Sequence, residues 1–369
     1  MSTSQRFPAL DIFRGMTICF MIIVNTPGDS SVTFAPLLHA NWHGFTPTDL
    51  VFPSFLFAVG NAMSFVMLKW AGLPQSAVLW KILKRTAIIF LLGYLMYWFP
   101  FFAPDKTGAW HLKPIAETRI FGVLQRIALS YGIASLMIYY LSTRWVIILT
   151  LLFLVAYKFL LNGWGDLSLE GNAVLKLDTW LIGEKHLYHG EGIGFDPEGL
   201  LSTLPAIGNV VFGYLAGKYV QQKGKTYEGL THLLMAGFAA ICFAYFWDSS
   251  FPINKKLWTS SFVLYTVGLD LVILAFIIYI TDFLKIIKWS SFFEVFGKNP
   301  LFIYLLSEIG LVILWSIPIG KLNAVSWIYT NIFKHAGPYI GSLLFALWWM
   351  MTCWVVGWWM DRKKVYVRV

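Results

Sequence analysis

Uncharged apolar runs long enough to cross a lipid bilayer follow one another along this chain, and they constrain its fold more than any other feature. Residues 339–360 form one such run without a single Asp, Glu, Lys or Arg. A spanning helix needs about 20 consecutive apolar residues. Only 13% of the 369 residues are charged, against about 25% in an ordinary soluble domain. The sequence therefore predicts an all-α polytopic membrane protein, with one transmembrane domain over residues 1–369.

The hydropathy pattern divides the chain into ten predicted transmembrane helices. We place them at residues 10–25, 49–69, 84–102, 120–141, 145–161, 200–220, 229–247, 260–280, 299–317 and 339–360. Ten spans put both termini on one side, and most of the 28 Lys and Arg fall in the loops on that side. Because basic loops favour the cytoplasm, we expect an N-in, C-in topology. Residues 1–10 lack the pattern of a cleavable signal peptide, and we predict a bacterial inner membrane.

Two polar segments on the predicted external side are longer than simple connections between helices. Residues 26–48 and 162–199 are rich in Trp, Gly and His rather than low in complexity, and acids gather in the second. We expect both to be ordered and functional. The net charge of +9 is explained by the basic loops, so it predicts no nucleic-acid partner. The three cysteines lie in apolar runs without a Cys/His cluster, which argues against disulfides and zinc.

Ionisable groups at or within the membrane are costly and are therefore candidates for function. Two histidines, His39 and His43, lie in the first long external segment, although such a histidine is more often structural or interfacial than catalytic. Arg119 and Arg126 are seven residues apart and share a helix face. One interpretation is a cationic clamp on a substrate or on a loop carboxylate. The other, which their position slightly favours, is a buried ion pair that fixes the orientation of the helix.

Four acids add to these candidates. Asp196 and Glu198 open the predicted sixth helix, where the helix dipole stabilises negative charge. Asp270 and Glu308 lie within apolar helices. Each of those two is a packing partner for a buried cation, a proton-linked transport residue or a catalytic carboxylate, and the sequence leaves the three roles open.

Several blocks of the sequence, taken together, resemble the heparan-α-glucosaminide N-acetyltransferase family. They occur in the family's order at residues 10–15, 25, 39–53, 122–126, 196–199, 253–258 and 297–300. The resemblance covers nearly the whole chain, and the joint pattern is specific although each block alone is weak. The lysosomal members have an additional luminal N-terminal region that this chain lacks. Bacterial relatives are often described as N-acetylglucosamine-related transporters.

The resemblance implies an acetyltransferase that uses cytoplasmic acetyl-CoA to acetylate a terminal glucosamine on the other side of the membrane. The family's catalytic histidine corresponds to His39 and its partner asparagine to Asn25, whereas His43 is not carried over. A neutral imidazole is suited to deprotonate the amine or to attack the thioester and carry the acetyl group. Asn25 is suited to stabilise the oxyanion or to orient the imidazole. The resemblance also implies a homodimer.

Further residues are candidates for holding the two substrates. For the CoA phosphates the candidates are Lys84, Arg85, Lys285, Lys288 and Lys298, which the orientation of basic loops would explain equally well. For the amino sugar they are Asp49, Arg126, Asp196, Glu198, Asn254 and Lys255. Two other functions remain open: a secondary transporter of an amino sugar, which Asp270 and Glu308 favour, and O-acetylation of a surface polysaccharide.

Overall fold

The computed structural model describes residues 7–104 and 109–367, apart from the side chains of residues 103 and 104. Residues 1–6, part of the segment predicted not to be a signal peptide, lie outside the described residues. Each of the ten predicted spans corresponds to a long helix. These helices are α1 (Pro8–Asn25), α2 (Pro47–Trp70), α3 (Gln75–Trp98), α4 (Val123–Tyr140), α5 (Thr143–Trp164), α7 (Thr203–Lys223), α8 (Tyr227–Asp248), α9 (Ser260–Ile278), α11 (Pro300–Ser316) and α13 (Pro338–Arg362).

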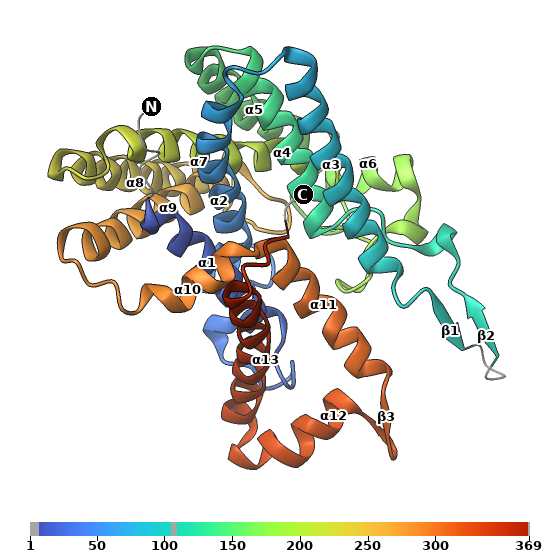
Figure 1. The fold of residues 1–369 in the computed structure, drawn as a ribbon. Helices are drawn as coiled ribbons and strands as arrows, with labels where there is room; N and C mark the ends of the chain where they lie inside the picture. Colours follow the sequence, from blue (N-terminus) through green and yellow to red (C-terminus); the bar gives the residue numbers. More distant parts are fainter. Residues whose placement is uncertain (1–6, 105–108, 368–369) are drawn as a thin grey trace.

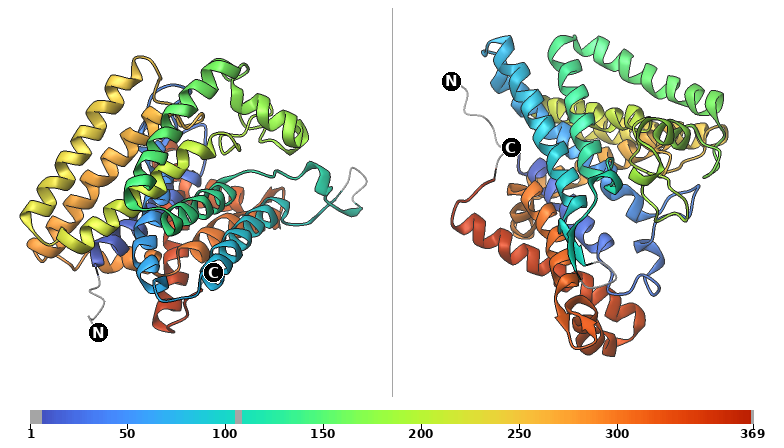
Figure 2. Two further views of the ribbon diagram at one scale, coloured as in Figure 1. Left: turned by 90° about the horizontal axis from the view of Figure 1, so that it is seen from above. Right: turned by 90° about the vertical axis from the view of Figure 1, so that its right-hand side faces the viewer.

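Shorter elements connect the long helices. They are the helices α6 (Ala173–Ile182), α10 (Ser290–Lys298) and α12 (Ala324–Ile328), a π-helical turn (Tyr279–Phe283) after α9, and the strands β1 (Phe102–Pro104), β2 (Trp110–Leu112), β3 (Pro318–Ile319) and β4 (Leu322–Asn323). The strands form two antiparallel hairpins, β1–β2 and β3–β4. The first hairpin and α6 lie at one edge of the molecule, while α8 and α9 lie side by side at another (Figures 1 and 2).

Six of the described helices are long and apolar enough to cross a membrane, or seven if α10 and α11, which are bent by 83° at their junction, count as one span. The protein is therefore mostly helical with at least several membrane-spanning helices. The prediction of ten crossings and of the N-in, C-in orientation is not tested by the fold. Helices such as α4, which carries buried Gln125 and Arg126, are covered by other helices. Less of their surface has to be apolar to face lipid.

Small residues allow the central helices to approach closely. α2 packs against α7, where a Cβ added to Gly60 would lie 1.9 Å from the carbonyl oxygen of Val210 and one added to Gly213 would lie 2.1 Å from that of Phe57. Gly217 follows four residues after Gly213, giving the small-x-x-x-small spacing typical of close helix pairs in membranes. The α2–α7 pair thus forms the fixed centre of the bundle, and α2 runs through it from one end to the other.

The first long polar segment is ordered and is tied to the C-terminal helix. The amide of Gly28 donates to the carbonyl of Ser342 at the start of α13 (3.2 Å), and the Ser342 hydroxyl accepts from the Asp29 amide (3.1 Å). A short 3₁₀ turn, Ala35–Leu37, then leads the chain back to α2. These contacts place residues 38–46 over the N-terminal end of α2.

Candidate functional site

His39 is bound to a buried carboxylate at the start of α2. Its Nδ1 lies 2.7 Å from Oδ1 of Asp49, whose side chain is 1% exposed whereas that of His39 is 41% exposed. A carboxylate on Nδ1 fixes the imidazole in the tautomer with its proton on Nδ1 and leaves Nε2 with a lone pair. The pair therefore presents a positioned basic nitrogen at an accessible surface.

Asp49 is held by the local folding of the α2 N-terminus. Thr46 is the N-cap residue, and its backbone amide donates to Oδ2 of Asp49 (2.9 Å). The amide of Ala40 donates to the same oxygen (3.1 Å). A capping box of this type satisfies backbone donors that the first helical turn leaves free. Oδ2 of Asp49 thus caps the first turn of α2, and Oδ1 orients His39.

A lysine from the α8–α9 connection completes the surroundings of His39. Nζ of Lys255 lies 3.0 Å from Nε2 and 3.1 Å from Nδ1 of the imidazole. Burial lowers the pKa of Lys255, and the negative charges of Glu198 and Asp49 act against that decrease. The residue brings a polarising cation, or a proton donor, directly to the imidazole.

Asn254 shapes the turn that carries Lys255. It is buried, and its Oδ1 accepts a hydrogen bond from the amide of Leu257 (2.8 Å). Its Nδ2 lies 3.2 Å from Nδ1 of His43, and burial lowers the pKa of His43. Asn254 and His43 therefore join the α8–α9 connection to the segment of residues 26–48 beside His39 rather than facing the imidazole directly.

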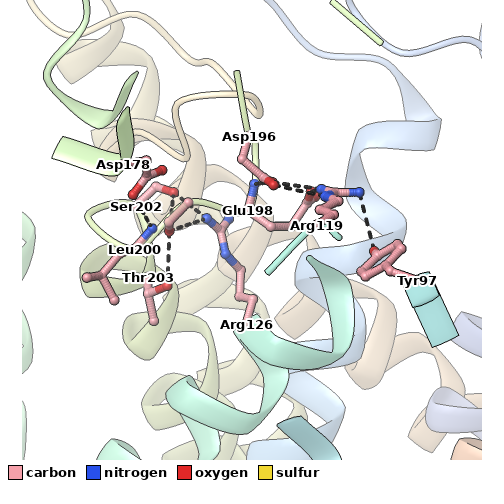
Figure 3. A network of polar contacts seen from close by, with 10 residues as sticks. Tyr97, Arg119, Arg126, Asp178, Asp196, Glu198, Leu200, Ser202 and Thr203 are labelled. Carbon is pink, nitrogen blue, oxygen red and sulfur yellow. Dashed lines mark hydrogen bonds and ion pairs between the residues drawn. The ribbon is translucent and has the colours of Figure 1, made fainter. Parts of the chain in front are cut away.

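An arginine and two acids form the next part of the site (Figure 3). Arg119 donates from Nε to Oδ2 of Asp196 (2.9 Å) and from Nη2 to Oδ1 (2.7 Å). The same Nη2 lies 2.8 Å from Oε2 of Glu198, and Nη1 donates to the hydroxyl of Tyr97 (3.3 Å). The guanidinium also stacks on the ring of Tyr188, 4.7 Å from its centroid.

The charges of this cluster are partly balanced. Burial raises the pKa of Asp196, and the hydrogen bonds from Arg119 oppose the increase. Burial also acts to raise the pKa of Glu198, but the charges of Arg119, Arg126 and Lys255 outweigh it, so that this pKa is lowered. Glu198 is thus an anion between Arg119 and Lys255, and it links the arginine cluster to His39.

Arg126 lies in the protein interior behind the cluster of Arg119, Asp196 and Glu198, and not at its surface. It is fully buried, and its Nη2 donates to the carbonyl of Gly199 (3.2 Å) and to the hydroxyl of Ser202. Its guanidinium lies over the ring of Trp258, 4.6 Å from the centroid. Arg126 therefore fixes the segment between Glu198 and α7, and its contacts are with the protein.

Asn25, the last residue of α1, lies at the same end of the bundle. Its side chain is close enough to the Glu308 carboxyl group in α11 to act on it electrostatically. The charge of Glu308 also acts on Tyr97, which binds Arg119. The intramembrane acid noted in the sequence is therefore part of the polar cluster and not an isolated packing contact.

A large cavity lies toward the other end of α2. Its volume is about 1230 Å³, and along α2 its lining extends from Phe55 to Lys69, about 21 Å of helix at 1.5 Å per residue. Most of the lining is apolar. Its charged members are Asp11, Arg14, Lys69, Arg85 and Lys298. Among the described residues, no group of three or more His, Cys, Asp or Glu is arranged to hold a metal ion.

Comparisons with known proteins identify the family of the chain. Residues 6–245 match the family model described as heparan-alpha-glucosaminide N-acetyltransferase, catalytic, which is more than half of the 369 residues. The chain belongs to this family. It is 26% identical to the heparan-alpha-glucosaminide N-acetyltransferase of Mus musculus over 432 aligned positions, which cover 100% of the chain and 61% of that relative.

The relative of the same name in Homo sapiens is also 26% identical, over 82% of the chain and 53% of its own length. The chain thus spans between about half and three-fifths of the length of these curated N-acetyltransferases. Residues His39, Asp49, Arg119 and Glu198 fall inside the family match, whereas Lys255 lies beyond its end.

The structure separates the predicted residues of this N-acetyltransferase family member into two groups. Those gathered at or directly behind the His39 end are Asn25, His39, Asp49, Arg126, Asp196, Glu198, Asn254 and Lys255. At the cavity, Arg85 and Lys298 line the wall, while Lys84, Lys285 and Lys288 are not among its lining residues. Arg14 and Lys69 line it without having been singled out, although both belong to the basic set predicted to face the cytoplasm.

Proposed function

We propose that this chain transfers an acetyl group from acetyl-CoA in the large cavity to the amine of a glucosamine-type sugar at His39. The observation that carries the proposal is the placement of the cavity and the His39–Asp49 pair along one helix. Phe55, which lines the cavity, is six residues from Asp49, or about 9 Å of helix axis. The proposal requires a passage for the long thin pantetheine arm along this part of α2, from Phe55 to the imidazole beside Asp49.

The cavity suits the donor's two chemically different ends. CoA carries phosphates, and four of the five charged lining residues among the described part of the chain are basic. Arginine in particular binds phosphate through paired N–H donors. The apolar walls from Phe55 onward suit the uncharged pantetheine arm. With the N-terminus inside, the basic rim faces the cytoplasm and His39 faces the periplasm of a bacterial inner membrane.

His39 acts at Nε2, since Nδ1 is bound to Asp49. Nζ of Lys255, which lies 3.0 Å from Nε2, has to move aside when the substrate reaches this nitrogen. As a general base, Nε2 takes a proton from the sugar ammonium, and the free amine attacks the thioester. As a nucleophile, it forms acetyl-imidazole with release of CoA thiolate, and the amine then takes the acetyl group. The Asn25 amide donates to the oxyanion that develops in either route. Glu198 and Asp196 form the wall against which the sugar binds.

The direct test uses purified protein with acetyl-CoA and glucosamine, and measures release of the CoA thiol. His39→Ala is expected to lower the rate at least about 100-fold, the usual contribution of a general base. His43→Ala is the matched control, because His43 is in the same segment and contacts Asn254 instead of Asp49. Full turnover by His39→Ala would refute the catalytic role. Labelled acetyl that stays on denatured wild-type protein and is absent from His39→Ala would establish the two-step route.

One observation favours the transporter instead. Asp270 is fully buried in α9, its Oδ1 accepts a hydrogen bond from Ser54, and its Oδ2 has no hydrogen-bond partner among the described residues. A proton-coupled carrier would depend on such a carboxyl group. Asp270 is not among the residues that line the cavity, so acetyl transfer is expected to survive Asp270→Asn. Uptake of labelled sugar into vesicles without CoA, lost in Asp270→Asn, would support the carrier. Acetylation of a polysaccharide hydroxyl but no amine would assign the O-acetyltransferase.

A further inference from the structure

The end of the chain turns back from α13 and lies against the junction of α10 and α11, near the C label in Figure 1. Asn299, the residue at this junction, is completely buried. Its Oδ1 accepts a hydrogen bond from the amide of Val367 (2.9 Å), and its Nδ2 donates to the carbonyl of Val365 (3.0 Å). One side chain thus holds two points of the terminal segment, residues 365–367.

The geometry indicates that hydrogen bonds fix the position of this attachment. Val365, Tyr366 and Val367 remain 45%, 38% and 45% exposed, so the segment lies at the surface and is only partly covered. The side chain of Asn299 makes no capping hydrogen bond to either helix at the junction. A buried amide needs partners for both of its ends, and here those partners are supplied by the terminal segment.

A second contact holds the same segment. The Tyr366 hydroxyl donates to Oδ1 of Asp361 (2.9 Å), and Nζ of Lys298 lies 2.8 Å from Oδ2 of that carboxylate. Lys298 and Val367 both line the large cavity. The terminal segment therefore forms part of the cavity wall at its basic end, and it adjoins a lysine that faces the cavity.

The segment also brings further positive charge to this end. Lys363 and Lys364 are exposed and directly precede residues 365–367. Since consecutive Cα atoms are 3.8 Å apart, Lys364 can be no more than about 11 Å from Val367 along the chain. The amides of Lys363 and Lys364 donate to the carbonyls of Trp359 and Asp361 in the last turn of α13, so both lysines are fixed beside the segment that Asn299 holds.

We propose that Asn299 positions the C-terminal segment as a rim of the donor cavity, and that this rim binds the phosphates of the CoA nucleotide. The inference rests on the proposed function, because it takes CoA as the occupant of the cavity. Asn299 does not contact the reacting atoms, so it is a positioning residue. Its effect should appear in the affinity for the donor and not in the rate of the chemical step.

The test compares two ligands that share the pantetheine arm and differ in the nucleotide. CoA and pantetheine are titrated into the full-length wild type, Asn299→Ala and a chain truncated after Lys364, each in the same lipid nanodiscs. The matched control is a chain truncated after Val367, which retains both hydrogen bonds to Asn299. Asn299→Ala and the truncation after Lys364 are expected to weaken CoA binding about tenfold, as for loss of one charge-assisted hydrogen bond, with pantetheine affinity unchanged.

The same variants separate binding from catalysis. With acetyl-CoA the KM is expected to rise while kcat stays at the wild-type value, and with S-acetylpantetheine neither constant should change. Two outcomes would overturn the proposal for the rim and leave the proposed acetyl transfer standing. One is a CoA affinity within twofold of wild type in both variants, and the other is an equal loss of affinity for CoA and pantetheine. If the wild type itself fails to bind CoA, the proposed acetyl transfer fails with it, and the two failures are thereby distinguished.

Discussion

Arg119 binds Asp196 through two parallel hydrogen bonds, from Nε to Oδ2 at 2.9 Å and from Nη2 to Oδ1 at 2.7 Å. The guanidinium is 16% exposed and the carboxylate is not exposed. Because Arg119 precedes α4 and Asp196 precedes α7, this pair joins two connections that are far apart in the sequence. The planar fork of arginine matches a carboxylate in a way that a lysine ammonium does not. The pair therefore ties the connection before α4 to the connection before α7.

We expect Arg119→Lys to destabilise the protein and to reduce acetyl transfer. The lysine retains the charge but can make neither the paired hydrogen bonds to Asp196 nor the stack on Tyr188. Removal of one partner from a buried ion pair costs about 3 kcal/mol or more, and the conservative change should cost part of that. Thermal unfolding and CoA release measure the two effects. Lys113→Arg, in the same connection, is the control and should change neither.

Much of the helical framework is predictable from this sequence, because apolar runs report the length of a span directly. The prediction of a helix at residues 84–102 begins late, since the structure starts α3 at Gln75. Lys81, Lys84 and Arg85 interrupt the apolar pattern there, although a helix continues through them at the edge of the membrane. The helix predicted at residues 299–317 matches α11, but the sequence does not indicate α10 or the 83° bend between the two helices, because a single Asn-Pro step does not reveal them.

The candidate site was predictable in its residues but not in its pairings. His39 and Asn25 came from the family resemblance, and Asp49 and Lys255 were expected to contact the sugar. The structure instead places both Asp49 and Lys255 directly on the imidazole. No sequence spacing indicates that residue 255 returns to residue 39, since this contact depends on how α8 and α9 pack. Arg119 binds two loop carboxylates in an ion pair that is largely buried, which agrees with both interpretations of this arginine and does not separate them.

Asp49→Asn is expected to lower kcat about 100-fold or more, in the range of effects seen when the partner of a catalytic histidine is lost. The amide oxygen still accepts from the Thr46 and Ala40 backbones, so α2 should fold normally. The amide cannot stabilise the imidazole as the carboxylate does, however. Steady-state CoA release measures kcat, and helical circular dichroism with an unchanged unfolding temperature verifies the fold. A variant with wild-type kcat would show that His39 functions without this carboxylate.

Gly60→Ala should separate α2 from α7. The added Cβ would lie 1.9 Å from the carbonyl oxygen of Val210, and backbone cannot move aside without shifting a helix. Overpacking of this kind costs about 1–3 kcal/mol, so the unfolding temperature should fall. Gly163→Ala in α5 is the matched control, because no atom lies within 4 Å of its added Cβ. There the higher helix propensity of alanine should leave stability equal or slightly greater, and equal losses at both positions would contradict the packing argument.

Asp178 in α6 should make the stability of the protein depend on pH. Its side chain is buried, Oδ1 accepts from the Leu200 amide (3.1 Å), and Oδ2 has no hydrogen-bond partner among the described residues. Burial raises the pKa of this carboxyl to about 7; the Leu200 amide and Arg126 oppose the increase, and Asp196 adds to it. The folded state therefore holds the proton more tightly than the unfolded state does.

Because the pKa is higher in the folded state, the protonated carboxyl group stabilises the fold. This contribution is complete below the unfolded pKa of about 4 and is lost as the pH rises through about 7. Asp178→Asn keeps an oxygen for Leu200 and removes the titration, so it should raise the unfolding temperature most at pH 8 and only about a third as much at pH 5, about one pKa unit above the unfolded value. Three pKa units set an upper limit of about 4 kcal/mol on the gain. Asp166→Asn, at an exposed position in the same segment, should bring no gain at pH 8. If wild type and Asp178→Asn unfold in parallel from pH 5 to pH 8, Asp178 is ionised throughout and the segment leading into α7 is held by another contact.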